Sequence, residues 1–437
     1  MRMILRNFKG GIHPADGKDL TAEKPISALA APSRVVIPML QHSGGASSVI
    51  VKAGQEVKVG QRIGEGRGFI SASVHASVSG IVAEISDSVH LSGALVPAVI
   101  IDNNGKDEWG PLDSCPDFDK QQPEALISKI HEAGVVGMGG AGFPTHVKLS
   151  PPEGNSIHTV IINGIECEPY LNADHRLMLE RPDDIISGIR ILMHILGAEL
   201  AVIGIERNKT NAIDVMRRAC ASTASVSVAA LAVKYPQGCE KMLIKSILSK
   251  EVPFGCLPMN LGVTVHNIGT VIAVFEAVCQ GKPLVQRVVT VSGPAVREPK
   301  NLLVKIGTPI AELIAACGGL TDDAAKIICG GPMMGFAVYS TDTPVTKGMS
   351  GIVVLRSKDA PDLDKYGACM KCGRCARACP MRLQPWLIAL YAEKGLHEQA
   401  KEHFCTDCIE CGCCSYVCPA KRPLTQFIKS AKSFKKK

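Results

Sequence analysis

CMKCGRCARACP, residues Cys369–Pro380, is matched in spacing by CIECGCCSYVCP, residues Cys408–Pro419. Both runs follow the pattern C-x2-C-x2-C-x3-C-P, which is the spacing of proteins that hold two 4Fe-4S clusters. The short intervals let one tight loop aim three sulfurs at a single cube, and the proline then turns the chain away. We therefore expect three thiolates of each run on one cluster and the fourth on the other cluster.

The doubled pattern assigns eight cysteines to two metal centres. One 4Fe-4S cluster is expected on Cys369, Cys372, Cys375 and Cys418, and the second on Cys408, Cys411, Cys414 and Cys379. Two zinc sites are the main alternative, because C-x2-C pairs also suit tetrahedral zinc. Cys405 and Cys413 fall outside both patterns and are expected to be thiols without a metal.

Length and composition indicate a globular protein of several domains. The chain has 437 residues, which is too long for one hydrophobic core, and about three domains are expected. Its 18 cysteines lie either in ligand-like runs or singly, and not in a disulfide framework. This usage favours a reducing compartment, the cytosol.

Composition and hydropathy argue against nucleic-acid binding, a membrane span and a signal peptide. Aromatic residues make up only 4% of the chain and no basic stripe recurs along it, so nucleic-acid binding is not expected. The longest uncharged run, 252–275, is interrupted by prolines and glycines and does not read as a membrane span. The N-terminus does not read as a signal peptide. The basic C-terminal tail is expected to contact anionic lipid or an acidic redox partner, or to be simply solvated.

The first two regions are an arm and a β domain. Residues 1–34 are polar and punctuated by glycine and proline, and they are expected to form an extended arm. Residues 35–109 alternate short β-branched runs with glycine turns. They resemble the barrel-sandwich fold of biotinyl and lipoyl carrier domains. The loop 68–73 has no lysine at the place where those carriers are modified, so the fold is expected without the carrier function.

An α/β pattern covers residues 120–285. A helix is expected over 123–133, followed by the glycine-rich stretch 137–142, in which backbone amides can approach a phosphate or a flat ring. A buried strand over 159–162 leads into the loop 163–169, which carries two carboxylates one residue apart. Loops at the carboxyl ends of parallel strands are where α/β folds place ligands.

Four stretches of this domain, at 137–148, 163–169, 234–240 and 262–270, resemble the flavin- and NADH-binding subunit of respiratory complex I. The resemblance implies that FMN is held by Gly137, Gly139, Gly140, Gly142, Lys148, Asn163, Glu166, Tyr235 and Asn267. It also implies that Glu168 and Glu240 lie near NAD(H). Met138, Ile165 and Cys239 depart from the complex I pattern, which keeps open a relay protein without flavin.

The last two regions are a strand-rich module and a cysteine-rich one. Residues 286–340 resemble the small β-grasp (SLBB-like) module of the same complex I subunit, and the pair Met333–Met334 is expected in its core. Residues 361–437 resemble an α-helical two-cluster ferredoxin domain with a basic tail, entered by a short linker at 361–365. Between the two cysteine runs, a single helix is expected over 385–401. The fold class is therefore a multidomain α/β protein.

The order of these parts resembles the C subunits of the Rnf complexes, the ion-translocating ferredoxin:NAD oxidoreductases. The resemblance runs from Gly10-Gly11-Ile12-His13-Pro14 to Cys418-Pro419 and includes Ala173-Asp174-His175-Arg176. It implies a peripheral subunit that passes electrons between NAD(H) and ferredoxin through FMN and two 4Fe-4S clusters. The implied partners are the membrane subunits of the complex and a ferredoxin-reacting iron-sulfur subunit, at the cytoplasmic face of the membrane. A soluble flavin and iron-sulfur reductase, of the cobalamin reductase or proline-reductase type, is the alternative.

Overall fold

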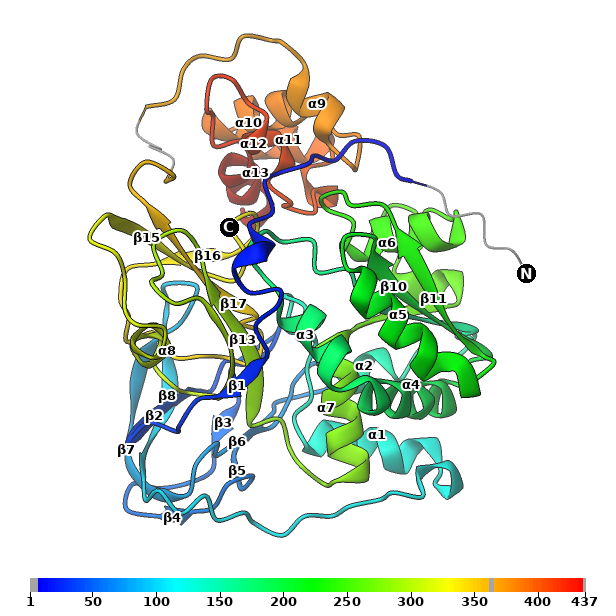
Figure 1. The fold of residues 1–437 in the computed structure, drawn as a ribbon. Helices are drawn as coiled ribbons and strands as arrows, with labels where there is room; N and C mark the ends of the chain where they lie inside the picture. The colour runs from blue at the N-terminus through cyan, green and yellow to red at the C-terminus, as the bar shows by residue number, and fades with distance from the viewer. Residues whose placement is uncertain (1–6, 361–364, 435–437) are drawn as a thin grey trace.

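The computed structural model describes residues 7–360 and 365–434. The chain forms a β domain, an α/β domain, a mixed sheet and a small helical region, which follow one another in colour in Figure 1. Of the expected linker 361–365 only Lys365 is described, and Lys435, Lys436 and Lys437 of the basic tail lie outside the described residues. Within the described ranges, no helix combines the length and the apolar character needed to cross a bilayer.

The β domain is a sandwich of two antiparallel sheets around one apolar core. One sheet has the order β2 (Arg34–Pro38), β8 (Leu95–Asn103), β7 (Gly80–Val89), β4 (Glu56–Val57). The other has the order β3 (Ser48–Val49), β5 (Arg62–Glu65), β6 (Val74–His75). Residues from both sheets, including Val35, Ile63 and Val82, are fully buried between them. Alternating β-branched residues thus build the two-layer core that the pattern predicts.

The α/β domain is built on a parallel sheet of four strands covered by helices on both faces. The strand order is β11 (Val226–Leu231), β10 (Leu200–Glu206), β9 (Thr159–Gly164), β12 (Val263–Asn267). One face is covered by α1 (Pro123–Glu132), α3 (Ala173–Glu180), α4 (Pro182–Leu196), α5 (Thr210–Ala219) and α7 (Ile268–Cys279), and the other by α6 (Glu240–Leu248). Successive residues of β9 enter opposite cores, as in a strand buried on both sides.

The order of the strands creates a switch point between β9 and β12. The chain leaves β9 toward α3, α4 and β10 on one side, whereas β12 is the neighbour on the other side and leads into α7. Asn163 of β9 and Asn267 of β12 are register partners at the carboxyl ends of these strands. In open α/β sheets, ligands bind at such a point, because the connections diverge there and leave a crevice.

The mixed sheet has six strands and extends past the residues expected for the module. Its order is β1 (Ile26–Ala28), β14 (Lys300–Lys305), β13 (Gln286–Ser292), β17 (Gly351–Arg356), β15 (Ala324–Cys329), β16 (Phe336–Val338), with α8 (Ile310–Ala316) packed on it. β1 comes from the arm, and β17 lies after residue 340 in the middle of the sheet. Met333 is partly buried and Met334 is exposed, so the expectation that both form the core of this module is wrong.

The helical region carries both cysteine runs. It consists of α9 (Arg374–Ala378), α10 (Pro385–Glu393), α11 (His397–Glu402), α12 (Cys413–Tyr416) and α13 (Leu424–Ser433). The single helix expected over 385–401 is wrong, because the chain breaks at Gly395, whose φ of 72° is left-handed. The break lets α10 and α11 pack on α13 from different directions around Ile388, Ala400 and Ile428.

Short turns complete the secondary structure. α2 (Thr145–Lys148) follows the glycine-rich stretch, and single 3-10 turns are found at Lys18–Leu20, Phe118–Lys120, Cys220–Ser222, Pro258–Leu261 and Cys405–Asp407.

The arm is extended, as the sequence predicts, and it contacts three other regions. The amide of Gly11 donates to the carbonyl of Ala378 in the helical region at 2.8 Å. Ile12 exchanges two backbone hydrogen bonds, of 2.8 and 2.9 Å, with Tyr235 of the α/β domain. Further along, β1 pairs in parallel with β14 of the mixed sheet. The arm is thus a strap that fixes these regions to one another.

Candidate functional site: two cysteine cavities beside a nucleotide edge

The first cavity is lined by cysteines of both runs. Cys369, Cys372 and Cys375 of the first run and Cys418 of the second surround a space of about 200 Å³. Trp386 and Leu424 add apolar wall, and Arg422 adds a cation. Gly373, with φ 72°, precedes α9 and allows the tight loop that presents the first three sulfurs. The structure therefore brings together the four cysteines that the spacing assigns to one cluster.

The second cavity holds the complementary set and is smaller and more buried. Cys379 of the first run and Cys408, Cys411 and Cys414 of the second line a space of about 20 Å³. Burial raises the pKa of the Cys408 thiol to about 11 and that of Cys414 to about 12, because a thiolate there is poorly solvated. A bound metal centre would supply the positive charge that such thiolates need. In both cavities, four cysteines beside apolar residues provide the thiolate donor set of a 4Fe-4S cluster.

Two further cysteines of this region are not among the eight that match the pattern. Cys405 is fully buried in the core of α11 and α13 and lines neither cavity. Cys413 lies on the wall of the second cavity and packs against Cys411 and Tyr235.

The glycine-rich loop lies next to the end of β12. A Cβ on Gly139 would stand only 3.2 Å from the Cβ of Asn267, whereas one on Gly140 would meet nothing within 4 Å. Gly137 and Met138 donate to Phe143 and Thr270, at 2.8 and 2.9 Å. Within the described part of the chain, the amides of Gly139, Gly140 and Ala141 donate no hydrogen bond. Three free amides on an exposed loop fit an anionic or flat ligand such as FMN.

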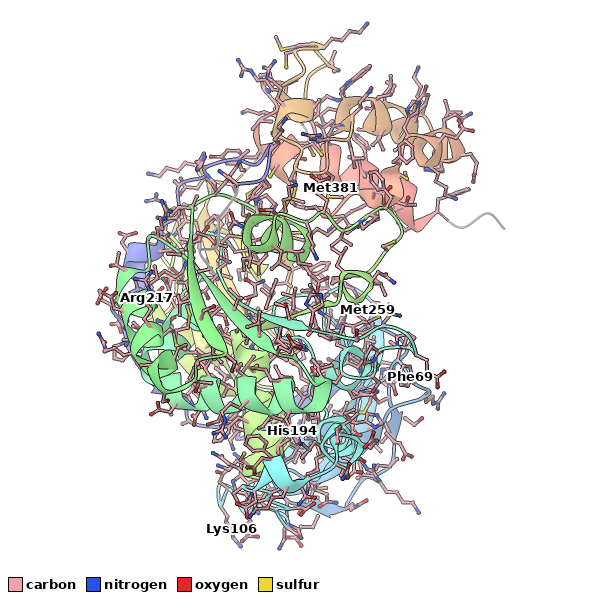
Figure 2. The ribbon with its side chains drawn as sticks, turned by 90° about the vertical axis from the view of Figure 1, so that its right-hand side faces the viewer. Phe69, Lys106, His194, Arg217, Met259 and Met381 are labelled. Atoms are coloured by element: carbon pink, nitrogen blue, oxygen red, sulfur yellow. The ribbon has the colours of Figure 1, made fainter. Side chains whose placement is uncertain are left out.

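The β domain supports this loop from the other side. The amide of Ser43 donates to the carbonyl of Gly142 at 2.9 Å, and its hydroxyl donates to Ala141. The loop without a carrier lysine reaches α2, where the carbonyl of Phe69, labelled in Figure 2, lies 3.0 Å from Nε2 of His146. The carrier-like fold here serves as a support for the glycine-rich loop.

Lys148, Asn163 and Glu240 meet at the same edge of the sheet. Lys148 forms an ion pair of 2.8 Å with Glu240, and it also donates to the carbonyl of Val265 at 2.9 Å. Asn163 donates to the carbonyl of Gly238 at 2.8 Å. These three side chains, all expected at the nucleotide, therefore come from α2, β9 and the start of α6.

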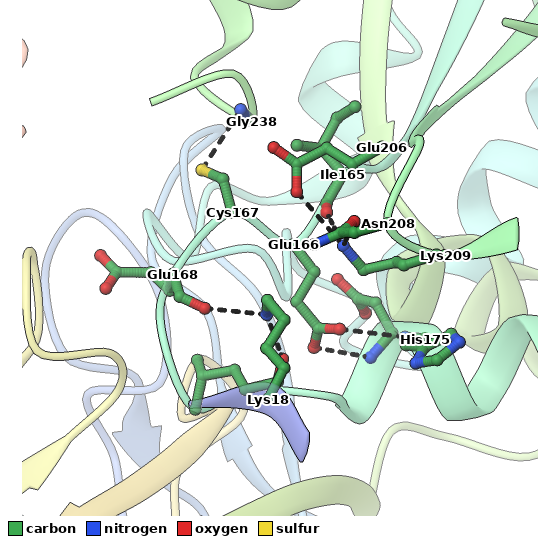
Figure 3. A network of polar contacts seen from close by, with 12 residues as sticks. Lys18, Ile165, Glu166, Cys167, Glu168, His175, Glu206, Asn208, Lys209 and Gly238 are labelled. Carbon is green, nitrogen blue, oxygen red and sulfur yellow. Dashed lines mark hydrogen bonds and ion pairs between the residues drawn. The ribbon is translucent and has the colours of Figure 1, made fainter. Parts of the chain in front are cut away.

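The acidic loop is held by two buried lysines, as Figure 3 shows. Lys18 of the arm donates to the carbonyls of Glu168, at 2.9 Å, and Leu171. Lys209 donates to the carbonyl of Ile165 at 2.7 Å and pairs with Glu206 at 3.3 Å. The sequence reasoning missed both lysines. Because both lysines reach the loop through backbone carbonyls, no side chain of the loop itself signals these contacts in the sequence.

The two carboxylates of this loop have different surroundings. Glu166 accepts hydrogen bonds from the amides of Asp174 and His175, at 2.9 and 3.0 Å, and so caps the start of α3. Glu168 accepts from the amide of Met333 at 3.0 Å and lies 3.5 Å from the hydroxyl of Tyr235. Burial raises the pKa of Glu168 to about 7. Glu166 therefore orders the loop, while Glu168 connects it to the mixed sheet.

Asn267 is fixed by a buried acid. Its Oδ1 accepts from the amide of Gly269 at 2.9 Å and caps α7, and its Nδ2 donates to Asp174 at 2.6 Å. Burial, with the charge of Glu166 nearby, raises the pKa of Asp174 to about 7. Asp174 lies in the stretch Ala173–Arg176, which sequence reasoning matched to a family without giving it a role.

An apolar junction joins this edge to the second cysteine cavity. Ile12, Tyr235, Ala378, Cys411 and Cys413 are buried together, and Met333 packs against them. Tyr235, one of the residues expected at FMN, thus lies between the acidic loop and a cysteine of the second cavity. The first cavity has no such contact with the α/β domain among the described residues.

Comparison with protein families divides the chain in the same order. Residues 6–106 match the RnfC barrel sandwich hybrid domain, and residues 130–276 match the Nuo51 FMN-binding domain. Residues 288–337 match the SLBB domain, and residues 362–419 match the 4Fe-4S dicluster domain. The expected fold class is confirmed. The chain carries FMN and two 4Fe-4S clusters, and the zinc alternative and the relay without flavin are wrong.

Known proteins resemble the chain over almost its whole length. The C subunit of the proton-translocating ferredoxin:NAD(+) oxidoreductase complex of Clostridium ljungdahlii is 47% identical over 98% of this chain and 94% of its own. The C subunit of the Na(+)-translocating complex of Acetobacterium woodii is 42% identical over 97% and 96%. The crystal structure of an NAD+-reducing [NiFe]-hydrogenase in the air-oxidized state shares the fold, with a TM-score of 0.50 and 18% identity over 64% of this chain and 54% of that one.

Proposed function

This chain belongs to the family of C subunits of the ion-translocating ferredoxin:NAD(+) oxidoreductase complexes. We propose that its nucleotide edge, by which we mean the glycine-rich loop 137–142 and the side chains of Lys148, Asn163 and Asn267, forms one electron route with the two cysteine cavities. The function as a flavin and iron-sulfur subunit of such an oxidoreductase follows from the family. The alternative of a soluble cobalamin or proline-reductase type reductase is set aside by the same relatives.

The eight cysteines are the cluster ligands, shared between the runs. The observation that carries this assignment is that each cavity is lined by the first three pattern cysteines of one run and the fourth pattern cysteine of the other, with Cys413 also at the second cavity. Cys369, Cys372, Cys375 and Cys418 would hold the first cluster. Cys379, Cys408, Cys411 and Cys414 would hold the second.

FMN would lie at the switch point between β9 and β12. Gly137, Gly139, Gly140 and Gly142 would offer backbone amides and close approach, while Asn163, Asn267, Tyr235, Glu166 and Lys148 would shape the edge. Lys148 is already paired with Glu240, so its charge would reach a ligand only in part. Glu168 and Glu240 would border NAD(H), and no general acid or base is needed for hydride transfer.

FMN supplies the exchange between the two-electron hydride chemistry of NAD(H) and single electrons. The residues of this chain place the groups that take part. Tyr235 and its apolar junction would exclude water between the nucleotide edge and Cys411. The second cavity would therefore serve as the entry to the clusters and the first cavity as the outer end.

The names of the curated relatives support a proposal for the partners and the place of the subunit. The curated relatives are named as subunits of complexes that translocate protons or Na(+). We infer that this chain binds the membrane subunits of such a complex and a ferredoxin-reacting iron-sulfur subunit. It would do so as a peripheral subunit at the cytoplasmic face of the membrane.

One sample tests the central assignment. The chain would be expressed alone, reconstituted anaerobically with iron, sulfide and FMN, and assayed for flavin, iron and NADH-driven bleaching. About one FMN and about eight iron per chain, with flavin reduced by NADH, is the expected result. Iron without FMN, and no bleaching by NADH, would contradict the nucleotide edge proposed here.

A further inference from the structure

The two cysteine cavities differ in their exposure to solvent. Cys369 and Cys372 of the first cavity are exposed, whereas Cys411 and Cys414 of the second are buried. The loop that carries the exposed pair leads into α9 at the outer end of the molecule, at the top of Figures 1 and 2. An electron at the first cavity is therefore separated from a docked protein only by this loop.

The stretch of sequence that contains this loop is basic and lacks acidic residues. From Lys365 to Ala392 the sequence contains no aspartate or glutamate, but it contains Lys371, Arg374, Arg377 and Arg382 in addition to Lys365. By contrast, the segment before the second run includes Glu398, Glu402 and Asp407. The charge therefore belongs to the neighbourhood of the first cavity and not to the helical region as a whole.

The cations that border the first cavity are available to a partner. Lys371 and Arg374 are exposed and line the cavity, and Lys421 is exposed directly after its rim residues Pro419 and Ala420. Among the described residues, neither Lys371 nor Arg374 takes part in an ion pair or a side-chain hydrogen bond. These two positive charges are therefore available to attract a partner protein.

An apolar centre completes the surface. Met370 is 69% exposed at the cavity, and Pro419 is exposed beside it. Protein interfaces commonly combine such a centre with a polar rim, and methionine and arginine are enriched in them. We define the outer cluster face as Met370, Lys371, Arg374, Pro419 and Lys421.

We propose that the outer cluster face docks the acidic surface of a one-electron carrier protein. The proposal rests on the proposed function, because it needs a cluster in the first cavity. One electron passes between that cluster and the carrier, so that one is oxidised as the other is reduced, and no bond forms or breaks. The basic rim steers the carrier and the apolar centre lets the two redox groups approach. A protein is favoured over an anionic membrane because the exposed cysteines Cys369 and Cys372 lie next to the face, where a redox partner would come close to the cluster.

The test is the rate of electron transfer from a defined probe. The oxidised, reconstituted holoprotein would be mixed in a stopped-flow instrument with a chemically reduced, small acidic bacterial ferredoxin that has two 4Fe-4S clusters, because transfer in this direction is favourable. The ionic strength would be varied from about 10 mM to about 300 mM, since exposed charges are screened over this range. The wild-type rate constant is expected to fall steeply with salt.

Charge reversal tests whether the rate depends on the charges of this face or only on the net charge of the protein. Lys371→Glu with Arg374→Glu should lower the low-salt rate constant at least about tenfold and flatten its salt dependence. The control is Lys52→Glu with Lys106→Glu on the β domain, which changes net charge equally and should change the rate less than about twofold. If the EPR spectrum shows that the double variant has lost its first cluster, Lys421→Glu is tested instead, because Lys421 lies outside the cysteine loops. This variant is expected to lower the rate constant by an intermediate amount.

The outcomes separate the possibilities. Equal rates for the face variants and the control, with both clusters intact by EPR, would overturn the docking proposal while leaving the proposed function in place. A wild-type holoprotein that NADH cannot reduce would overturn the proposed function, and the docking proposal with it. If the face variants keep the wild-type rate but no longer bind vesicles that contain phosphatidylglycerol, as the wild type would, the face contacts the membrane instead.

Discussion

The side chain of Asn267 donates to the buried carboxyl of Asp174 at 2.6 Å while it caps α7. Because burial raises the pKa of Asp174 to about 7 in the folded chain, the folded state binds this proton more tightly than the unfolded state does. Its stabilising contribution is complete below about pH 4, near the ordinary pKa of aspartate. It is lost as the pH rises through about 7.

Asp174→Asn keeps an acceptor for Asn267 but removes the titration. At pH 8 the variant should unfold at a higher temperature than the wild type, by about 3 °C, which corresponds to about 1 kcal/mol for a domain of this size. At pH 4.5 the difference should shrink toward zero. Thermal unfolding of both proteins across this range measures the effect, and a difference independent of pH would contradict it.

Gly139 is the glycine of the nucleotide loop where a side chain has the least room. Gly139→Ala would place a Cβ 3.2 Å from that of Asn267 and push the loop away from the end of β12. We expect FMN affinity to fall about tenfold, or about 1.4 kcal/mol. The control is Gly45→Ala, whose Cβ would meet nothing within 4 Å and whose φ is not left-handed. Flavin fluorescence titration compares the two, and equal affinities would contradict a role for the loop.

Cys418 and Cys379 test how the two runs share ligands. Cys418→Ser should remove the first cluster, although Cys418 belongs to the second run, and leave the second cluster intact. Cys379→Ser should do the opposite. Iron content should fall from about eight to about four per chain in each case. EPR spectra should lose different signals in the two variants, and loss of the same signal would contradict crossed ligation.

Arg422 places a buried cation at the first cavity. It pairs with Glu393, donates to the carbonyl of Gly367 at 3.2 Å and lies over the ring of Tyr366. Arg422→Gln should lower the midpoint potential of the first cluster by about 40 mV, or about 1 kcal/mol for one electron, because the reduced cluster loses a nearby positive charge. EPR-monitored redox titration measures this shift.

Lys421→Gln removes the same charge from the neighbouring exposed residue. Water screens that position, so its potential should shift by less than half as much. A shift of equal size in both variants would contradict a special role for the buried guanidinium.

Gly11 of the arm is pressed against the α/β domain at Tyr235. Gly11→Ala would bring a Cβ to 2.6 Å from the carbonyl of Tyr235, at a φ of 80°. Gly54→Ala has the same kind of φ, 81°, but open space around it. We expect the first variant to lose about 2 kcal/mol more stability than the second, since only it adds a collision to the backbone strain. Hydrogen exchange should show loosening at residues 374–378 in Gly11→Ala alone.

The sequence predicts the parts of this protein that depend on local spacing. The crossed sets of cysteines follow from two short patterns, and the parallel sheet follows from the alternation of apolar runs with helices. The arm is largely extended because its glycines and prolines oppose a long helix. In these cases the signal lies within a few residues of the structure it specifies.

The features that were missed depend on contacts distant in sequence. β17 lies in the middle of the mixed sheet although a loop of more than ten residues separates it from β16. Lys18 and Lys209 bind backbone carbonyls, which every residue carries. Gly395 differs from these features, because a glycine after a helix is a local stop signal that the single helix expected over 385–401 passes over. The other features need the tertiary structure before they can be assigned.

The hydrogen bond from Gly11 to Ala378 also constrains how the protein is made. The strap leaves the ribosome well before the helical region that contains one of its binding sites. Contacts this far apart in sequence form slowly, because most of the chain must be ordered before its ends can meet. The strap would therefore close only after the cluster-bearing region has emerged. A newly made chain would then connect the α/β domain to the second cavity only after both have been synthesised.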